Sequence, residues 1–267
     1  MVSELAPVAE ATASRTVDAG RGGAWWTEGW RLFVPSAGTW ILVVVILFVL
    51  NVVVGLIPVL GHVAGLILFP ILTGGLMLGC RAIDRGEPLT VNHLFAGFTE
   101  RAGPLFIVGI IYCIVSFAIV LLVFTILATF FGAAVLTQLW NLPDIASLPS
   151  LLGDFLLAFL AGLLLLLLLF MPLLMAIWFA PALVVLRGVD PVRALTLSFS
   201  ASLKNVLPFT VYGVIGVVLA IAASIPLGLG WLVLAPVSIA SLYASYCDIF
   251  DDEIAAPGPG SNLLTPR

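Results

Sequence analysis

Six apolar runs dominate this sequence, and each is long enough to cross a membrane as a helix. They extend over Thr39 to Leu56, Val63 to Ile83, Leu105 to Phe131, Leu163 to Leu186, Pro208 to Ser224 and Gly230 to Ile249. Because a helix rises about 1.5 Å per residue, about 20 apolar residues cross a hydrocarbon layer about 30 Å thick. We therefore predict an all-α integral membrane protein with six transmembrane helices.

The composition excludes several other classes of protein. Only 9% of the 267 residues are charged and 62% are hydrophobic, whereas charged residues make up about 25% of a soluble domain. A water-soluble fold, a disordered chain and a basic nucleic-acid-binding protein all need more charge than this. We expect the partners to be the lipid bilayer and proteins, and no nucleic acid.

The fourth run allows more than one interpretation, because its apolar stretch continues from Phe155 to Leu186. A straight helix of this length would extend about 48 Å, well beyond the hydrocarbon layer. Pro172 can mark a kink, or the part from Phe155 to Leu169 can tilt or extend past the bilayer. Two spans in place of one are the rival interpretation, and the distribution of basic residues argues against it.

All ten Lys and Arg residues lie on one side of the membrane when the chain has six spans. They are Arg15, Arg21, Arg31, Arg81, Arg85, Arg101, Arg187, Arg193, Lys204 and Arg267. Lys and Arg near span ends favour the cytoplasmic side. We therefore expect a multi-pass protein of the bacterial inner (cytoplasmic) membrane, with both termini cytoplasmic.

The ends of the chain differ in composition from the middle. Residues 1–22 are mostly polar and small and have no apolar core, so we expect no cleavable signal peptide. We expect residues 1–22 and 251–267 to be disordered cytoplasmic tails. The six-span helical membrane domain is expected to cover residues 23–250.

The sequence also contains an internal repeat. The segment from Ile57-Pro58 through Phe69-Pro70 to Cys80 parallels the segment from Ile225-Pro226 through Ala235-Pro236 to Cys247. The segment that begins at Met171-Pro172 matches the one that begins at Phe69-Pro70. Short links join spans one and two, and spans five and six, as tight hairpins.

A short amphipathic segment precedes each predicted hairpin. Its apolar positions are Trp26, Trp30 and Phe33 in the first copy, Val91, Phe95 and Phe98 in the second, and Val192, Leu195, Phe199 and Leu203 in the third. Such stripes beside basic residues are typical of helices that lie at a membrane interface. The predicted fold is thus three parallel repeats of an interfacial helix plus a transmembrane hairpin, not the inverted repeats of many transporters.

These segments supply the candidate contact residues. We expect contacts with lipid, including anionic headgroups, or with a protein partner at Trp26, Trp30, Arg31, Phe33, Phe95, Phe98, Arg101, Arg193, Phe199 and Lys204. Gly75 and Gly79 form a GxxxG pattern that permits close helix approach. Packing within the chain is the favoured interpretation of this pattern, and self-association is the alternative.

The tryptophan-rich segment Trp25-Trp26-Thr27-Glu28-Gly29-Trp30-Arg31-Leu32-Phe33 is the most specific motif in the chain. With Phe69-Pro70-Ile71-Leu72-Thr73-Gly74-Gly75-Leu76 and Leu94-Phe95-Ala96-Gly97-Phe98, it resembles a family of uncharacterised proteobacterial inner-membrane proteins. The resemblance extends from Trp25 to Phe250. The layout is more distantly similar to the membrane domain of some glycerophosphodiester phosphodiesterases, whose catalytic barrel this chain lacks. The resemblance therefore implies an inner-membrane location and no chemistry.

Catalytic and metal-binding patterns are missing from the sequence. His62 and His93 fall on opposite sides of the membrane, and no Cys, His and acid residues have the spacing of ligands or of a nucleophilic triad. We expect no enzyme activity, cofactor or metal. The leading hypothesis is a non-enzymatic membrane scaffold that binds lipid or a partner, and the alternative is a transporter or channel for an uncharged or lipid-like solute.

Overall fold

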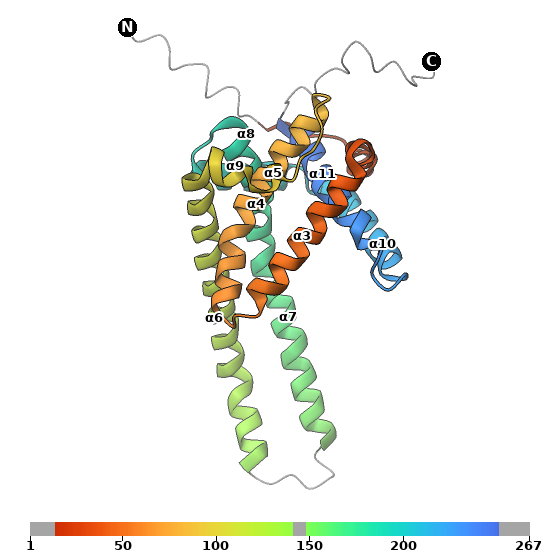
Figure 1. The fold of residues 1–267 in the computed structure, drawn as a ribbon. Helices are drawn as coiled ribbons and strands as arrows, with labels where there is room; N and C mark the ends of the chain where they lie inside the picture. The colour runs from red at the N-terminus through yellow and green to blue at the C-terminus, as the bar shows by residue number, and fades with distance from the viewer. Residues whose placement is uncertain (1–13, 141–147, 251–267) are drawn as a thin grey trace. The chain divides into compact units, whose positions relative to one another are not determined.

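The computed structural model describes residues 14–140 and 148–250, and every regular element within these ranges is a helix (Figure 1). The elements are α2 (Arg21–Phe33), the 3-10 turn η1 (Val34–Ser36), α3 (Ala37–Gly55), α4 (Leu60–Asp84), α5 (Asn92–Glu100), α6 (Ala102–Trp140), α7 (Leu148–Trp178), α8 (Ala180–Arg187), α9 (Pro191–Lys204), α10 (Val206–Ser224) and α11 (Trp231–Phe250).

The all-helical fold is confirmed for the described residues. Six helical segments of the described residues are long and apolar enough to cross a membrane: Arg21–Gly55, Leu60–Asp84, Ala102–Thr129, Leu152–Arg187, Val206–Ser224 and Trp231–Phe250. The fourth apolar run falls within one of these candidate spans. The first of these segments joins the amphipathic helix α2 to the apolar helix α3 through η1.

The fourth run is interrupted at Phe179 and not at Pro172, which lies inside α7. Pro181 has no N–H group and cannot continue the hydrogen-bond ladder of α7. Helix α7 therefore ends before it, and α8 begins at Ala180 with Pro181 in its first turn. The Phe179 N–H donates instead to Ser198 Oγ of α9, at 2.9 Å. A side chain from a later helix thus satisfies the backbone group that the break exposes.

The predicted boundary of the N-terminal tail needs correction. Residues 14–22 belong to the described structure, and α2 already begins at Arg21. The Arg15 N–H donates to the Ile249 carbonyl at 2.9 Å, so this stretch is attached to the end of α11. The rest of the predicted tails, residues 1–13 and 251–267, lies outside the described residues.

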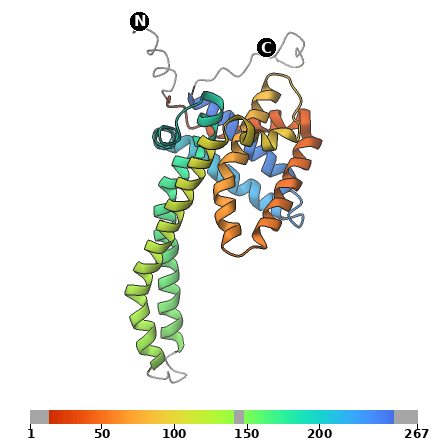
Figure 2. The same ribbon diagram turned by 60° about the vertical axis from the view of Figure 1, so that its left-hand side comes forward.

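The chain divides into two compact units. One unit is a helical hairpin of Ile111–Leu174, from the later part of α6 and most of α7. These two helices run side by side (Figures 1 and 2) and meet where Leu127 lies against the backbone of Gly162. With 39 residues, α6 is about 58 Å long, longer than a hydrocarbon layer of about 30 Å requires.

The other unit comprises residues 14–110 and 175–250 and has three helices at its centre. Helix α4 contacts both α8 and α11. Phe179, at the start of α8, packs edge-on against Phe250 of α11, with ring centroids 5.4 Å apart. The guanidinium of Arg187 lies over the Tyr246 and Phe250 rings. Aromatic side chains thus fill the space between the ends of these helices.

The short helices α2, α5 and α9 pack around these central helices. Helix α2 lies against α11, α5 against α4, and α9 against α8. Small residues form the contacts: a Cβ on Gly29 would lie 2.7 Å from the Val237 carbonyl oxygen, and Ala194 and Ala201 are fully buried. Each of these short helices comes before two long ones along the chain: α2 before α3 and α4, α5 before α6 and α7, and α9 before α10 and α11.

Candidate functional site

The site begins at the crossing of α4 and α5, which are in close backbone contact. Gly97 of α5 lies so near α4 that an added Cβ would be 2.0 Å from the Ile71 carbonyl oxygen. Gly75 faces the backbone of α5 in the same way, and Gly79 lies against the Leu89 and His93 side chains. The two glycines of the GxxxG pattern therefore face a short helix of the same chain.

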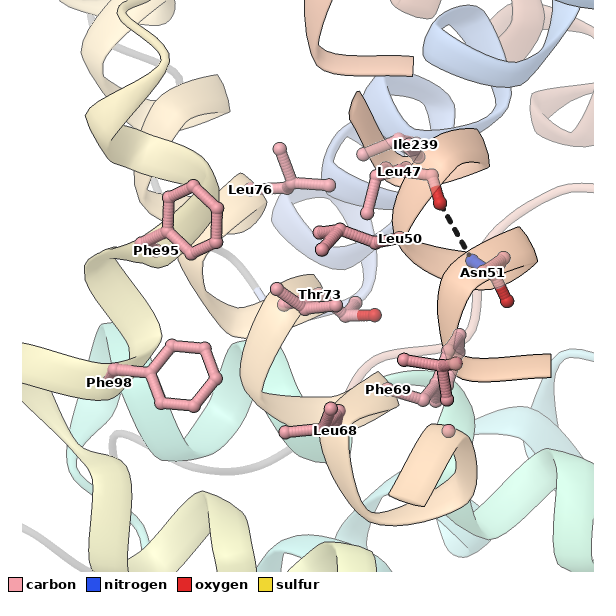
Figure 3. A pocket seen from close by; sticks show the side chains of 13 residues that line it. Leu47, Leu50, Asn51, Leu68, Phe69, Thr73, Leu76, Phe95, Phe98 and Ile239 are labelled. Carbon is pink, nitrogen blue, oxygen red and sulfur yellow. Dashed lines mark hydrogen bonds between the residues drawn. The ribbon is translucent and has the colours of Figure 1, made fainter. Parts of the chain in front are cut away.

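This crossing leaves the large side chains of α5 beside α4. Leu94 and Gly97 are buried in the contact, whereas Phe95 and Phe98 are each 42% exposed on one flank. Figure 3 shows both rings extending from α5 towards the side chains of α4. They form one wall of a cavity of about 370 Å³.

The cavity is an apolar groove between α3, α4 and α5, which we call the α3–α5 groove. Its lining residues are Leu47, Leu50, Asn51, Val54, Gly65, Leu68, Phe69, Leu72, Thr73, Leu76, Phe95, Phe98 and Ile239. Among these, Asn51 and Thr73 have polar side chains, and Asn51 Nδ2 donates to the Leu47 carbonyl at 3.0 Å (Figure 3). Such a surface binds hydrocarbon and offers few partners to a polar solute.

A second arrangement in the same unit is a buried polar cluster at the end of α11. Asp248 is 9% exposed, and its Oδ2 accepts from Trp25 Nε1 at 2.9 Å and from Arg21 Nε at 2.6 Å. Its Oδ1 pairs with Arg15 Nη2 at 3.1 Å. Fully buried Asn205 accepts from the Val17 N–H at 2.9 Å and donates to the Arg15 carbonyl at 3.0 Å.

This polar cluster attaches residues 15–21 to three helices. We call these residues the N-terminal strap. The strap connects the ends of α9 and α11 to the start of α2, so it holds distant parts of the sequence together. Both oxygens of Asp248 and both polar atoms of the Asn205 side chain have partners, which suits a structural role better than a catalytic one.

The predicted contact residues of α2 have different environments. Trp26 is 9% exposed, stacks on Tyr212 at 4.6 Å and donates from Nε1 to the Tyr212 carbonyl at 3.0 Å. Phe33 is buried too, whereas Trp30 is 51% exposed and Arg31 is exposed. Trp26 and Phe33 therefore contact the protein and not lipid, because the buried face of α2 is wider than the predicted stripe.

The other predicted contact residues lie nearer the surface. Arg101, Arg193 and Lys204 are exposed, and Phe199 is half-buried. In α9 the face that packs on the protein consists of small residues such as Ser198, whose Oγ donates to the Met175 carbonyl at 2.7 Å. The larger apolar residues of α9 are left towards the outside.

Metal ligands do not gather within the described residues, where no group of three His, Cys, Asp or Glu side chains is placed to hold an ion. His93 has a local role, because its Nδ1 accepts from the Thr90 N–H at 3.1 Å near the start of α5.

Sequence reasoning missed both the α3–α5 groove and the polar cluster. Arg15 and Asp248 are 233 positions apart, and nothing in the sequence pairs them. A carboxylate in the last turn of an apolar helix was the available signal, since such a group needs a donor when it is buried.

The comparisons with known proteins agree with a membrane protein of uncharacterised type. The chain is 29% identical over 255 residues to a "probable inner membrane protein" of Burkholderia thailandensis, and the match covers 88% of this chain and 90% of the relative. No protein-family model and no solved structure matches the chain. The similarity and the six apolar helices together support a multi-pass inner-membrane protein.

Proposed function

We propose that this protein is a non-catalytic inner-membrane scaffold that binds lipid and holds an acyl chain in the α3–α5 groove. The groove is the observation that carries the proposal, because its volume of about 370 Å³ falls within the range of about 300–1,000 Å³ typical of ligand sites. Its apolar walls suit a hydrocarbon chain, and the exposed Phe95 and Phe98 rings form the side of the groove that belongs to α5.

The three short helices support an interfacial role for one face of the protein. Each packs on a central helix through small residues, which leaves Trp30, Phe95 and Phe98 exposed. The exposed cations Arg31, Arg101, Arg193 and Lys204 on or beside these helices suit anionic headgroups, each worth about 1 kcal/mol near a charged surface. In this proposal the face that carries them is cytoplasmic, as are both termini.

A threefold repeat also fits the contacts between helices. Helix α5 packs on α4, the second helix of the preceding hairpin. Helix α9 packs on α8, which follows α7, and α2 packs on α11. We interpret this arrangement as three copies of one unit, each of which begins with a short helix. Gly75 and Gly79 are covered by α5, so self-association through this GxxxG pattern is disfavoured.

The groove is tested by filling it. Thr73→Trp places an indole among the lining residues, whereas Thr210→Trp places one on an exposed position of α10 and serves as the matched control. Purified protein is incubated with a photoactivatable fatty acid, irradiated and digested. We expect saturable labelling of α3 and α4 that Thr73→Trp lowers severalfold and Thr210→Trp leaves unchanged.

Equal labelling of the two variants would remove the groove as an acyl-chain site. Proteoliposomes that contain the protein and a lipid-like solute separate this proposal from the transporter hypothesis. A scaffold leaves the distribution of the solute between the two leaflets unchanged, whereas a transporter accelerates its exchange.

A further inference from the structure

A second cavity lies beside the same crossing, on the opposite flank of α5 from the groove. It has a volume of about 310 Å³ and is lined by Leu78, Arg81, Ala82, Arg85, Glu87, His93, Ala96 and Glu100. On α5, residues at positions 93, 96 and 100 share one face, and Phe95 and Phe98 lie on another. The two cavities are therefore separate sites, and an inference about one does not depend on the other.

Small side chains and a tight turn produce this cavity. Ala82 and Ala96 leave room where α5 crosses α4. At the end of α4, Gly86 has a φ of +83°, and the Glu87 N–H donates back to the Ala82 carbonyl at 2.9 Å. This is the hydrogen-bond pattern of a Schellman motif, and it returns the chain so that Glu87 lies beside the last turn of α4.

The charges in the cavity are balanced but not paired with one another. Two guanidinium groups, Arg81 and Arg85, share it with two carboxylates, Glu87 and Glu100. Among the described residues, none of these four side chains takes part in a hydrogen bond or an ion pair. His93 Nδ1 accepts from the Thr90 N–H, so a neutral His93 ring carries its proton on Nε2 as a further donor.

We propose that this cavity binds a phosphoethanolamine group, with the phosphodiester at Arg81 and Arg85 and the primary ammonium at Glu87 and Glu100. Guanidinium groups bind phosphate oxygens in a bidentate manner, and an ammonium donates to carboxylates. The cavity and the phosphoethanolamine group each carry a positive and a negative charge side by side. Arg81 and Arg85 lie at the end of the candidate span Leu60–Asp84, where lipid headgroups are found.

The same side chains discriminate against the other common headgroups. An anionic headgroup without an ammonium leaves both carboxylates unpaired beside its own charge, which opposes binding. A choline group has no N–H to donate and is usually held by aromatic rings, and of the residues that line this cavity only His93 has a ring.

The test is native mass spectrometry of the full chain, equilibrated in detergent with equal amounts of dioleoyl phosphatidylethanolamine, phosphatidylglycerol and phosphatidylcholine. We expect preferential retention of phosphatidylethanolamine. The Arg81→Gln/Arg85→Gln variant lowers this retention about tenfold, which corresponds to about 1.4 kcal/mol. The Glu87→Gln/Glu100→Gln variant removes the preference over phosphatidylglycerol. Asp18→Asn, which alters an exposed charged side chain outside the cavity and outside the proposed headgroup contacts, is the control and changes neither quantity.

Soluble glycerophosphoethanolamine distinguishes two sources of the ligand. If it displaces the bound lipid, the headgroup alone is recognised. If it does not while phosphatidylethanolamine is retained, the site requires a lipid. Equal retention of the three lipids by the wild-type protein overturns the proposal. Gln pairs that retain the three lipids as Asp18→Asn does overturn it as well. Circular dichroism and a single size-exclusion peak establish that each variant is folded.

Discussion

The polar cluster around Asp248 makes the most direct prediction about stability. Its carboxylate accepts from Trp25 Nε1 and pairs with Arg21 and Arg15, and all three donors come from the other end of the chain. We predict that Asp248→Ala loosens the N-terminal strap and destabilises the domain, because it removes the acceptor that these donors share.

The expected magnitude follows from the burial of each partner. Trp25 is fully buried, so its N–H loses its acceptor where water cannot replace it, at a cost of about 1–3 kcal/mol. The side chains of Arg21 and Arg15 are 36% and 50% exposed, and ion pairs of exposed groups contribute about 0–1 kcal/mol each. We expect the free energy of unfolding to fall by about 1–5 kcal/mol in total.

Two measurements test this expectation in detergent micelles. The first is the free energy of unfolding, with Asp248→Asn as an intermediate variant that keeps an acceptor but loses the charge. The second is the rate of trypsin cleavage after Arg15, which reports local opening of the strap. Cleavage is expected to accelerate at least about tenfold, the equivalent of about 1.4 kcal/mol.

Asp18→Ala is the control, because Asp18 is an exposed carboxylate in the same strap. Its effect is expected to stay within about 0.5 kcal/mol. If Asp248→Ala matches Asp18→Ala in both unfolding and cleavage, the strap is not held by the carboxylate and the reasoning fails.

The packing makes two further predictions, and the distribution of basic residues makes a third. Gly97→Ala forces a Cβ against the Ile71 carbonyl oxygen and should lower the free energy of unfolding by at least about 1–3 kcal/mol. Gly103→Ala is the control and should be neutral or stabilising, because the space around Gly103 is open. Equal effects of the two substitutions would contradict the close crossing of α4 and α5. Trp26→Ser should lower the free energy of unfolding by about 3–5 kcal/mol, and Trp30→Ser should lower it much less, because only Trp26 is buried. Labelling that reports the membrane depth of α2 should instead respond to Trp30→Ser. A reporter fused after Arg193 should be cytoplasmic, and a periplasmic location would refute both the orientation and the single span of the fourth run.

The short helices show where sequence reasoning was sufficient and where it was not. Their existence and approximate bounds follow from the period of the apolar residues, a local property. The buried faces did not follow, because small residues such as Gly29, Gly97 and Ala194 determine the contacts together with large ones. Close backbone approach is favourable only when a partner helix is present, and the partner is not adjacent in the sequence.

The apolar runs alone were sufficient to predict the spans. A run of about 20 apolar residues has a single favourable environment, so six such runs predict six membrane helices without knowledge of their neighbours. The tertiary structure decided which side chains meet. Asp248 and Arg15 pair across 233 positions, and the α3–α5 groove takes its walls from separate helices. Both depend on how the helices pack, and in a membrane small residues and polar groups at specific positions determine that packing more than overall hydrophobicity does.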